Sequence, residues 1–218
     1  MAGRLEGPSS SVNMVKIFFV CRRRAGLAVE DYRRMVLEEH VPLALEHHRT
    51  MRRYEINLVQ AMPVGVPETV SIAVLCFNSL ADYQQRLYDS KTSRTIIETD
   101  AARFMGGADA YLTEETVLVE GPPRGPLGEP AAGNKTMVLL KLGRQTGPDV
   151  LTERLLGLAD GKCRLVLNPV RKRLSESGPD WQAFVELHRN LGAGEAGALL
   201  GDTATGLVCY PVDEYVEK

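Results

Sequence analysis

The 218-residue sequence has no surplus of charge of one sign, no membrane-length apolar run and few aromatic residues. The apolar run at residues 17–21 is too short to span a bilayer, and residues 1–13 lack the apolar core of a signal peptide. A formal net charge of −2 gives no general attraction to nucleic-acid phosphates. We therefore predict a cytoplasmic protein that binds neither a membrane nor a nucleic acid.

Motifs for metals, nucleotides and serine nucleophiles are also missing. The four cysteines are far apart and include no Cys-x-x-Cys pair, so they are interpreted as reduced thiols in the core. Gly106-Gly107 precedes an expected strand instead of a helix, and no Gly-x-Ser-x-Gly is present. His47 and His48 are adjacent, with no third ligand nearby. We predict neither a metal nor a cofactor.

The first half of the chain shows a regular alternation of strand and helix patterns. Strands are expected at 14–21, 53–60, 69–77 and 110–119, and helices at 29–40, around 80–87 and around 96–104. Ser79 with Asp82 three residues later resembles a capping box at the start of the second helix. The order βαββαβ is that of a ferredoxin-like domain, whose sheet has one uncovered face and therefore implies a partner domain or subunit.

The second half repeats this order with little identity of residues. A segment rich in proline and glycine, 120–134, is typical of a linker. Strands are expected at 136–142, 163–170, 181–188 and 205–212, and helices at 149–158 and 191–200. We predict an α+β protein of two ferredoxin-like βαββαβ domains, 14–119 and 135–218, after a disordered leader at 1–13.

One histidine stands at an informative place. His40 is followed by Val41 and Pro42, and a helix does not continue easily into proline, so the first helix is expected to end at His40. The carbonyl end of a helix favours a protonated imidazole. Since the ordinary pKa of histidine is about 6.5, His40 is a candidate for proton transfer near neutral pH.

Several segments of the first half resemble the EthD family of the dimeric α/β-barrel superfamily. They are residues 15–27, 38–43 (Glu-Glu-His-Val-Pro-Leu), 53–59 and 100–104, and the resemblance spans about residues 14 to 119. It implies two sheets paired as a barrel, an apolar cavity between sheet and helices, and a homodimer. The second half has no equivalent of His-x-Pro-Leu, so one intact site per chain is expected. Whether the two halves pair with each other or with a second chain stays open.

With this resemblance, His40 is the expected general acid/base. Asn57 is a candidate to orient a substrate carbonyl or the imidazole, or else makes a hydrogen bond at the strand edge. Asp100 either fixes the tautomer of His40 or is a surface carboxylate of the following turn. Tyr54 and Asn57 point to opposite faces of their strand, and we favour Asn57 for the cavity. The side chains expected to bind substrate are Tyr32, Val36, Tyr54, Tyr83 and Phe104.

The resemblance implies a cofactor-independent lyase or cyclase that dehydrates, cyclises or decarboxylates a small aromatic or polyketide-like substrate. A cofactor-free monooxygenase is an alternative. A second alternative is a non-catalytic binding or assembly protein with a filled barrel, for which Phe18, Phe19 and Phe77 are bulky enough. Haem binding at His40 or His188 is a weaker hypothesis.

Overall fold

The computed structural model describes residues 14–63, 66, 68–121, 129, 131, 133–144, 146–159 and 163–216. Its strands are β1 (Val15–Arg23), β2 (Met51–Val59), β3 (Ser71–Phe77), β4 (Met105–Thr113), β5 (Thr116–Val119), β6 (Lys135–Leu142), β7 (Leu165–Arg173), β8 (Ala183–Leu187) and β9 (Ala204–Val216). Its helices are α1 (Val29–Arg34), the π-helix η1 (Met35–His40), α2 (Val41–His47), α3 (Leu80–Arg86), α4 (Lys91–Phe104), α5 (Pro148–Leu156), α6 (Ala193–Leu200) and the short 3₁₀-helix η2 (Gly201–Thr203). The predicted leader and most of the predicted linker lie outside the described residues.

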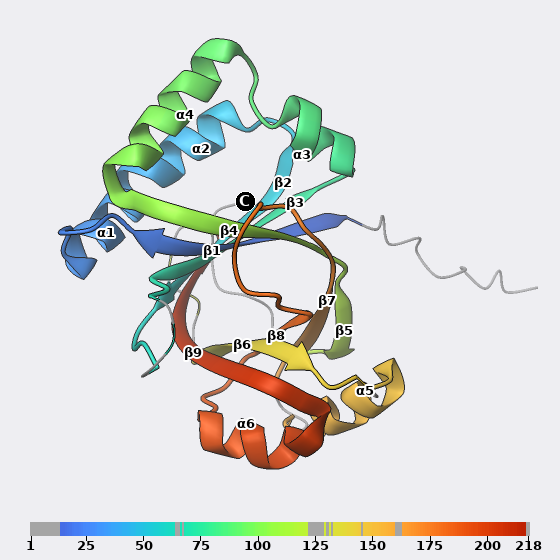
Figure 1. Ribbon diagram of the computed structural model, residues 1–218. Helices are drawn as coiled ribbons and strands as arrows, with labels where there is room; N and C mark the ends of the chain where they lie inside the picture. Colours follow the sequence, from blue (N-terminus) through green and yellow to red (C-terminus); the bar gives the residue numbers. More distant parts are fainter. Residues whose placement is uncertain are drawn as a thin grey trace, which may run out of the picture.

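All strands join in one antiparallel sheet that closes into a barrel (Figure 1). The order is β4-β1-β3-β2-β9-β6-β8-β7, and β7 pairs with both β4 and β5, which completes the ring. The two halves therefore pair with each other, along β2–β9 and along β4/β5–β7. This confirms the α+β barrel and answers the open question of pairing. The division into two ferredoxin-like domains stays a prediction, since one sheet runs through both halves.

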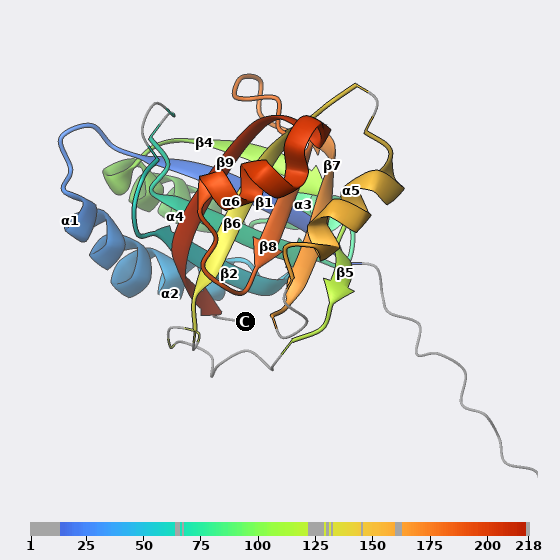
Figure 2. The ribbon, with the colours of Figure 1, turned by 90° about the horizontal axis from the view of Figure 1, so that it is seen from below.

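Alternating side chains on the strands create three apolar cores. One lies between the first-half strands and the helices from α1 to α4, and another between the second-half strands and α5 and α6. Figure 2 shows α5 and α6 lying over their part of the sheet. The third fills the barrel, where the rings of Phe18 and Phe184 stack with centroids 4.7 Å apart. Phe19 and Phe77 belong to the first helix-covered core, so only one of the three predicted filling residues lies inside.

The helix expected to end at His40 in fact continues to His47. α1, η1 and α2 form one continuous helix, and the N–H of Val41 donates to the carbonyl of Val36, five residues back. Pro42 is tolerated because it falls in the first turn after this π segment, where the backbone bonds have left the regular i to i−4 pattern. His40 is therefore inside a helix, and the expected effect of a carbonyl end on its charge does not apply.

The other expected elements lie close to their predicted positions. The main difference is the strand expected at 110–119, which begins earlier and is divided into β4 and β5. Gly106 lies inside β4, and a Cβ there would stand 2.4 Å from the Arg23 carbonyl oxygen, so β1 approaches closely only because this residue is glycine. Among the described residues, no helix is long and apolar enough to cross a membrane.

The predicted cap of α3 is present and gives a stability test. The Oγ of Ser79 accepts a hydrogen bond from the Asp82 N–H at 3.2 Å. We expect Ser79→Ala to lower the free energy of unfolding by about 1 kcal/mol, because one N–H of the first turn loses its acceptor. Urea unfolding measures this change. Ser175→Ala, which alters an exposed loop hydroxyl, is the control; equal effects for both variants would contradict the capping role.

Candidate functional site

His40 in η1 faces Asp100 in α4. The imidazole Nδ1 lies 2.9 Å from Asp100 Oδ2, and the His40 and Asp100 side chains are only 12% and 6% exposed. The imidazole also packs against Phe104 in a T-shaped arrangement, with ring centroids 5.1 Å apart. The structure therefore brings together two candidate residues that are far apart in the sequence. π-helical segments such as η1 are frequent at functional sites.

The surroundings of His40 favour the neutral imidazole. Burial lowers the pKa of His40 below its ordinary value, while the hydrogen bond and charge of Asp100 oppose part of that shift. The other carboxylate oxygen, Asp100 Oδ1, accepts from Arg103 at 3.0 Å, and Arg103 also pairs with Glu39 at 2.8 Å. With a carboxylate as acceptor, Nδ1 donates its hydrogen, which leaves the lone pair on Nε2.

A shallow groove of about 400 Å³ adjoins this pair. Its walls combine methyl groups, hydroxyl groups and one guanidinium, from Leu43, Thr92, Thr95, Ile96, Thr99, Asp100 and Arg103. Asp100 thus connects the buried imidazole with a surface depression large enough for a small organic molecule.

The side chains expected to bind substrate lie in the core between sheet and helices. Tyr32, Val36, Tyr54 and Phe104 are buried there, and Tyr83 packs against them. The hydroxyl of Tyr32 lies 2.7 Å from Ser71 Oγ, which satisfies its polar end. These residues support the helix that carries His40, and substrate binding by them stays a prediction.

Asn57 lies on the other face of the sheet from His40. Its neighbours Ile56 and Leu58 pack in the helix-covered core, whereas Asn57 is fully buried on the barrel side and donates to the Ile72 carbonyl at 2.9 Å. This corrects the expectation that Asn57 orients the imidazole. Because strand side chains alternate, Tyr54, which we did not favour, is the residue that shares the face of His40.

One end of the barrel interior contains a group of charged side chains. Lys16 contacts Glu115 at 2.7 Å and also pairs with Glu186. Lys135 pairs with Glu186 at 2.8 Å and with Glu214. Arg53 pairs with Glu55, which stands 3.7 Å from Lys135. The attraction of Glu186 and the other carboxylates outweighs burial and raises the pKa of Lys16, so this lysine stays charged.

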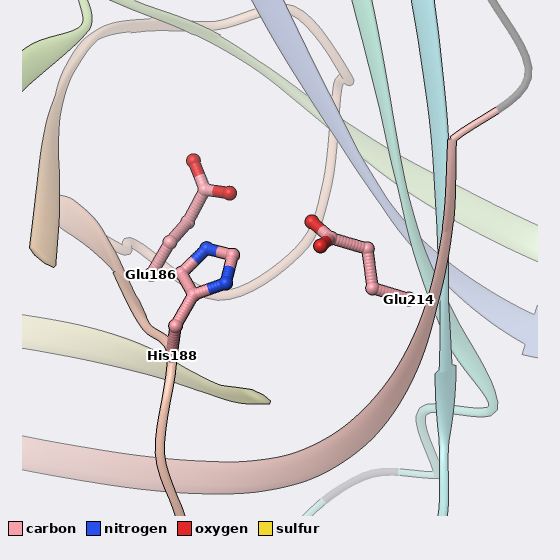
Figure 3. A group of neighbouring side chains, drawn as sticks. All are labelled: Glu186, His188 and Glu214. Atoms are coloured by element: carbon pink, nitrogen blue, oxygen red, sulfur yellow. The ribbon is translucent and has the colours of Figure 1, made fainter. Parts of the chain in front are cut away.

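Glu186, His188 and Glu214 resemble a metal-ligand set. One ligand atom from each lies within 4.8 Å of the others, and Figure 3 shows the imidazole beside both carboxylates. Carboxylate and imidazole groups suit a divalent cation. However, the ammonium of Lys135 ion-pairs with both glutamates. The carboxylates thus already bind a cation that belongs to the protein, and we assign no metal to them.

A pocket of about 880 Å³ opens at the same end of the barrel. Its lining is largely apolar with two ion pairs, and comprises Met14, Val15, Lys16, Cys76, Leu80, Leu112, Thr113, Glu114, Glu115, Thr116, Val117 and Arg171. Burial raises the pKa of Cys76 to about 12, so the thiol in this lining is not a ready nucleophile.

The sequence of the segment that carries His40 can be compared with known families. Residues 24–108 match the EthD domain. The predicted resemblance is confirmed over these residues, which contain both His40 and Asp100. No curated protein matches the sequence significantly.

Solved structures resemble the chain over nearly its whole length, beyond the EthD match. A proposed monooxygenase from Fusobacterium nucleatum subsp. nucleatum is 7% identical, with 96% of each chain covered and a TM-score of 0.62. An anthrone oxidase-like protein is 9% identical, with 95% of this chain and 94% of the other covered and a TM-score of 0.59. A mutant chlorite dismutase from Candidatus Nitrospira defluvii is 10% identical, with 94% and 92% covered and a TM-score of 0.52. At these identities the likeness establishes the fold alone.

The sequence analysis did not predict the group of charged side chains at the barrel end. Most of these residues lie outside the segment that matches the EthD domain. Lys16, Lys135, Glu186 and Glu214 each stand in or at the end of an apolar strand. In the sequence, each of these charged residues stands two positions from an apolar residue of the barrel core, which places both on the same strand face. This pattern could have indicated buried charges only if the enclosed strand face had been known.

Proposed function

We propose that the protein is an enzyme in which His40 acts as general base in a cofactor-free reaction of a small aromatic or polyketide-like molecule. The observation that carries this proposal is the 2.9 Å contact between His40 Nδ1 and Asp100 Oδ2 beside an open groove. A neutral imidazole held in one orientation by a carboxylate suits a general base, and Asp100 is the member of the pair that lines the groove.

The chemistry follows from the two nitrogen atoms of the ring. Nε2 removes a proton from an acidic C–H or O–H group of the substrate, and the imidazolium that forms is stabilised by the Asp100 carboxylate. Arg103 donates to the other carboxylate oxygen of Asp100 and so holds that side chain in position beside the ring. The same Nε2–H then returns its proton to a leaving hydroxyl, or to carbon after ring closure or loss of CO₂. These are the steps of a lyase or cyclase.

A cofactor-free monooxygenase is the second candidate, favoured by the fold shared with the proposed monooxygenase and the anthrone oxidase-like protein. It begins with the same proton removal. The resulting carbanion donates electrons to O₂, so that an anthrone and one O₂ give an anthraquinone and one water. The His40–Asp100 pair serves both reactions, and oxygen uptake separates them.

A panel of planar aromatic and polyketide-like compounds, with anthrone as the oxidation probe, tests the proposal. Oxygen uptake is followed with an electrode and product mass by mass spectrometry. Turnover that depends on His40 supports the proposal: uptake of O₂ identifies the monooxygenase, and loss of water or CO₂ without uptake identifies the lyase or cyclase. Equal turnover by His40→Gln overturns the role of His40 as the base. No turnover across the panel favours the binding or assembly alternative, which the filled barrel interior supports.

The pH dependence of turnover provides a further prediction. Because burial lowers the pKa of His40, kcat/KM is expected to be constant through neutral pH and to fall only below about pH 6.5, as the base becomes protonated. Asp100→Asn removes an interaction that raises the pKa, so its acidic limb is expected at lower pH. A pH–rate profile of each protein measures the pH at which its rate falls on the acidic side. A fall that begins well above pH 6.5 in the unmodified protein would contradict a lowered pKa of His40.

A further inference from the structure

The pocket at the charged barrel end lies where the barrel wall is interrupted. β4 ends at Thr113 and β5 begins at Thr116, and every residue from 112 to 117 lines the pocket. The pairing of β4 with β7 is also irregular here, since its register shifts between Leu112 and Thr113. The pocket is therefore associated with a local break in an otherwise continuous wall of strands.

The second half of the barrel has the same arrangement without the break. Lys16 in β1 and Lys135 in β6 have equivalent registers, each opposite a residue that precedes a glutamate by two positions. These glutamates, Glu115 and Glu214, pair with the two lysines. β9 runs unbroken past Glu214, whose side chain is 2% exposed, whereas the side chain of Glu115 is 28% exposed. The break thus opens in the first half a space that the second half encloses.

Every charged side chain in the described lining of this pocket has a partner of opposite charge. Lys16 contacts Glu115 at 2.7 Å and also pairs with Glu186. At the exposed side, Arg171 pairs with Glu114. A charged ligand therefore finds a counter-charge only by competing with one of these pairs, and a charge that leaves water without a partner is unfavourable.

The rest of the lining is mainly apolar. Val15, Leu80 and Leu112 contribute aliphatic side chains from three different elements. Burial raises the pKa of Cys76 to about 12, so the thiol beside them stays neutral. The volume of about 880 Å³ falls in the range, roughly 300–1,000 Å³, of pockets that bind small organic molecules.

We propose that the pocket binds an uncharged, largely apolar organic molecule, whose body lies against Val15, Leu80 and Leu112. Removing this apolar body from water stabilises the complex, and the ion pairs of the lining stay intact. An ammonium has to share Glu115 with Lys16, and a carboxylate has to share Lys16 with Glu115. This site lies at the barrel end and does not depend on the activity proposed for His40.

Three probes with the same ring system test the preference: 2-naphthalenemethanol, 2-naphthalenemethylamine and 2-naphthoate. Binding is measured by calorimetry and located by amide NMR shifts. We expect the alcohol to bind at least about tenfold more tightly than either charged probe, with shifts concentrated at residues 112–117. Equal or tighter binding of a charged probe, or no binding of the alcohol, overturns the proposal. Shifts confined to residues 92–103, which contribute to the groove beside Asp100, overturn it as well.

Variants of Leu80 link binding to the apolar wall. Leu80→Gln is expected to weaken binding of the alcohol about tenfold, because it removes apolar contact and adds an amide to the wall. Leu80→Met, which keeps an apolar side chain of similar size, is expected to retain the affinity. Leu87→Gln changes a half-buried leucine at the other end of α3, outside the described lining, and is the matched control.

Thermal unfolding of the variants confirms that they are compared in the folded state. An unchanged affinity in Leu80→Gln, or an equal loss in Leu87→Gln, overturns the proposal. His40→Gln is expected to bind the alcohol at residues 112–117 as the unmodified protein does, which keeps this test independent of the proposed activity.

Discussion

Replacing His40 with glutamine is expected to lower kcat/KM by about 10²- to 10⁴-fold, the contribution typical of a positioned acid/base group. Glutamine keeps a polar side chain of similar reach beside Asp100 but cannot take up a proton. The rate is measured on the compound of the aromatic panel that the protein converts fastest. His47→Gln, about two turns further along the same helix, is the matched control and is expected to leave the rate unchanged.

The folding of this variant has to be checked beside its rate, because His40 packs against Phe104. Thermal unfolding of His40→Gln and of Asp100→Asn separates lost catalysis from lost structure. A variant that melts normally and has lost its activity supports the base. A variant that melts normally and retains the rate would falsify the role given to His40.

Replacing Lys135 with methionine is expected to lower the free energy of unfolding by about 3–5 kcal/mol, the effect typical of breaking a buried ion pair from one side. The methionine fills much of the space, but Glu214 and Glu186 both lose the ammonium of Lys135, while Glu186 keeps its contacts with Lys16 and Asn168. Glu55 loses a cation at 3.7 Å as well. Guanidinium unfolding followed by circular dichroism measures the change.

A matched surface variant provides the control for Lys135. Arg94 pairs with Glu98 on the exposed side of α4, and Arg94→Met is expected to change the free energy of unfolding far less than Lys135→Met does, because an exposed ion pair contributes little. The double variant Lys135→Met/Glu214→Gln is expected to recover part of the lost free energy of unfolding, because it also removes the carboxylate that Lys135 contacts. Equal effects of the two single variants would show that the barrel-end charges are screened by water.

Much of the fold was predictable because apolar alternation specifies strands and helical spacing specifies helices. The expected strand at 69–77 corresponds to β3, and the expected helix at 149–158 to α5. The end of the first helix was not predictable. A proline such as Pro42 normally stops a helix. The π-helical segment before it, which accommodates this proline, depends on a shift of backbone hydrogen bonds that the sequence pattern does not predict.

The candidate site shows the same division. The pairing of His40 with Asp100 was one of two interpretations of Asp100 that the sequence left open, and the structure brings the two side chains together. Asn57 was placed wrongly beside His40 because the sequence shows alternation but not which strand face is enclosed. The equivalence of Lys16 and Lys135 becomes visible only in the cross-strand register, where Lys16 lies opposite Thr113 and Lys135 opposite Val212, each with a glutamate two residues further on.

The most direct test of the central claim is a measurement on the imidazole of His40 itself. Nitrogen NMR of labelled protein, with His40→Gln to assign the signal, gives the tautomer and the pKa of this ring. The account predicts hydrogen on Nδ1, a lone pair on Nε2, and a pKa below the ordinary value of about 6.5. Hydrogen on Nε2 at neutral pH, or a pKa above that value, would contradict the role of His40 as a ready base.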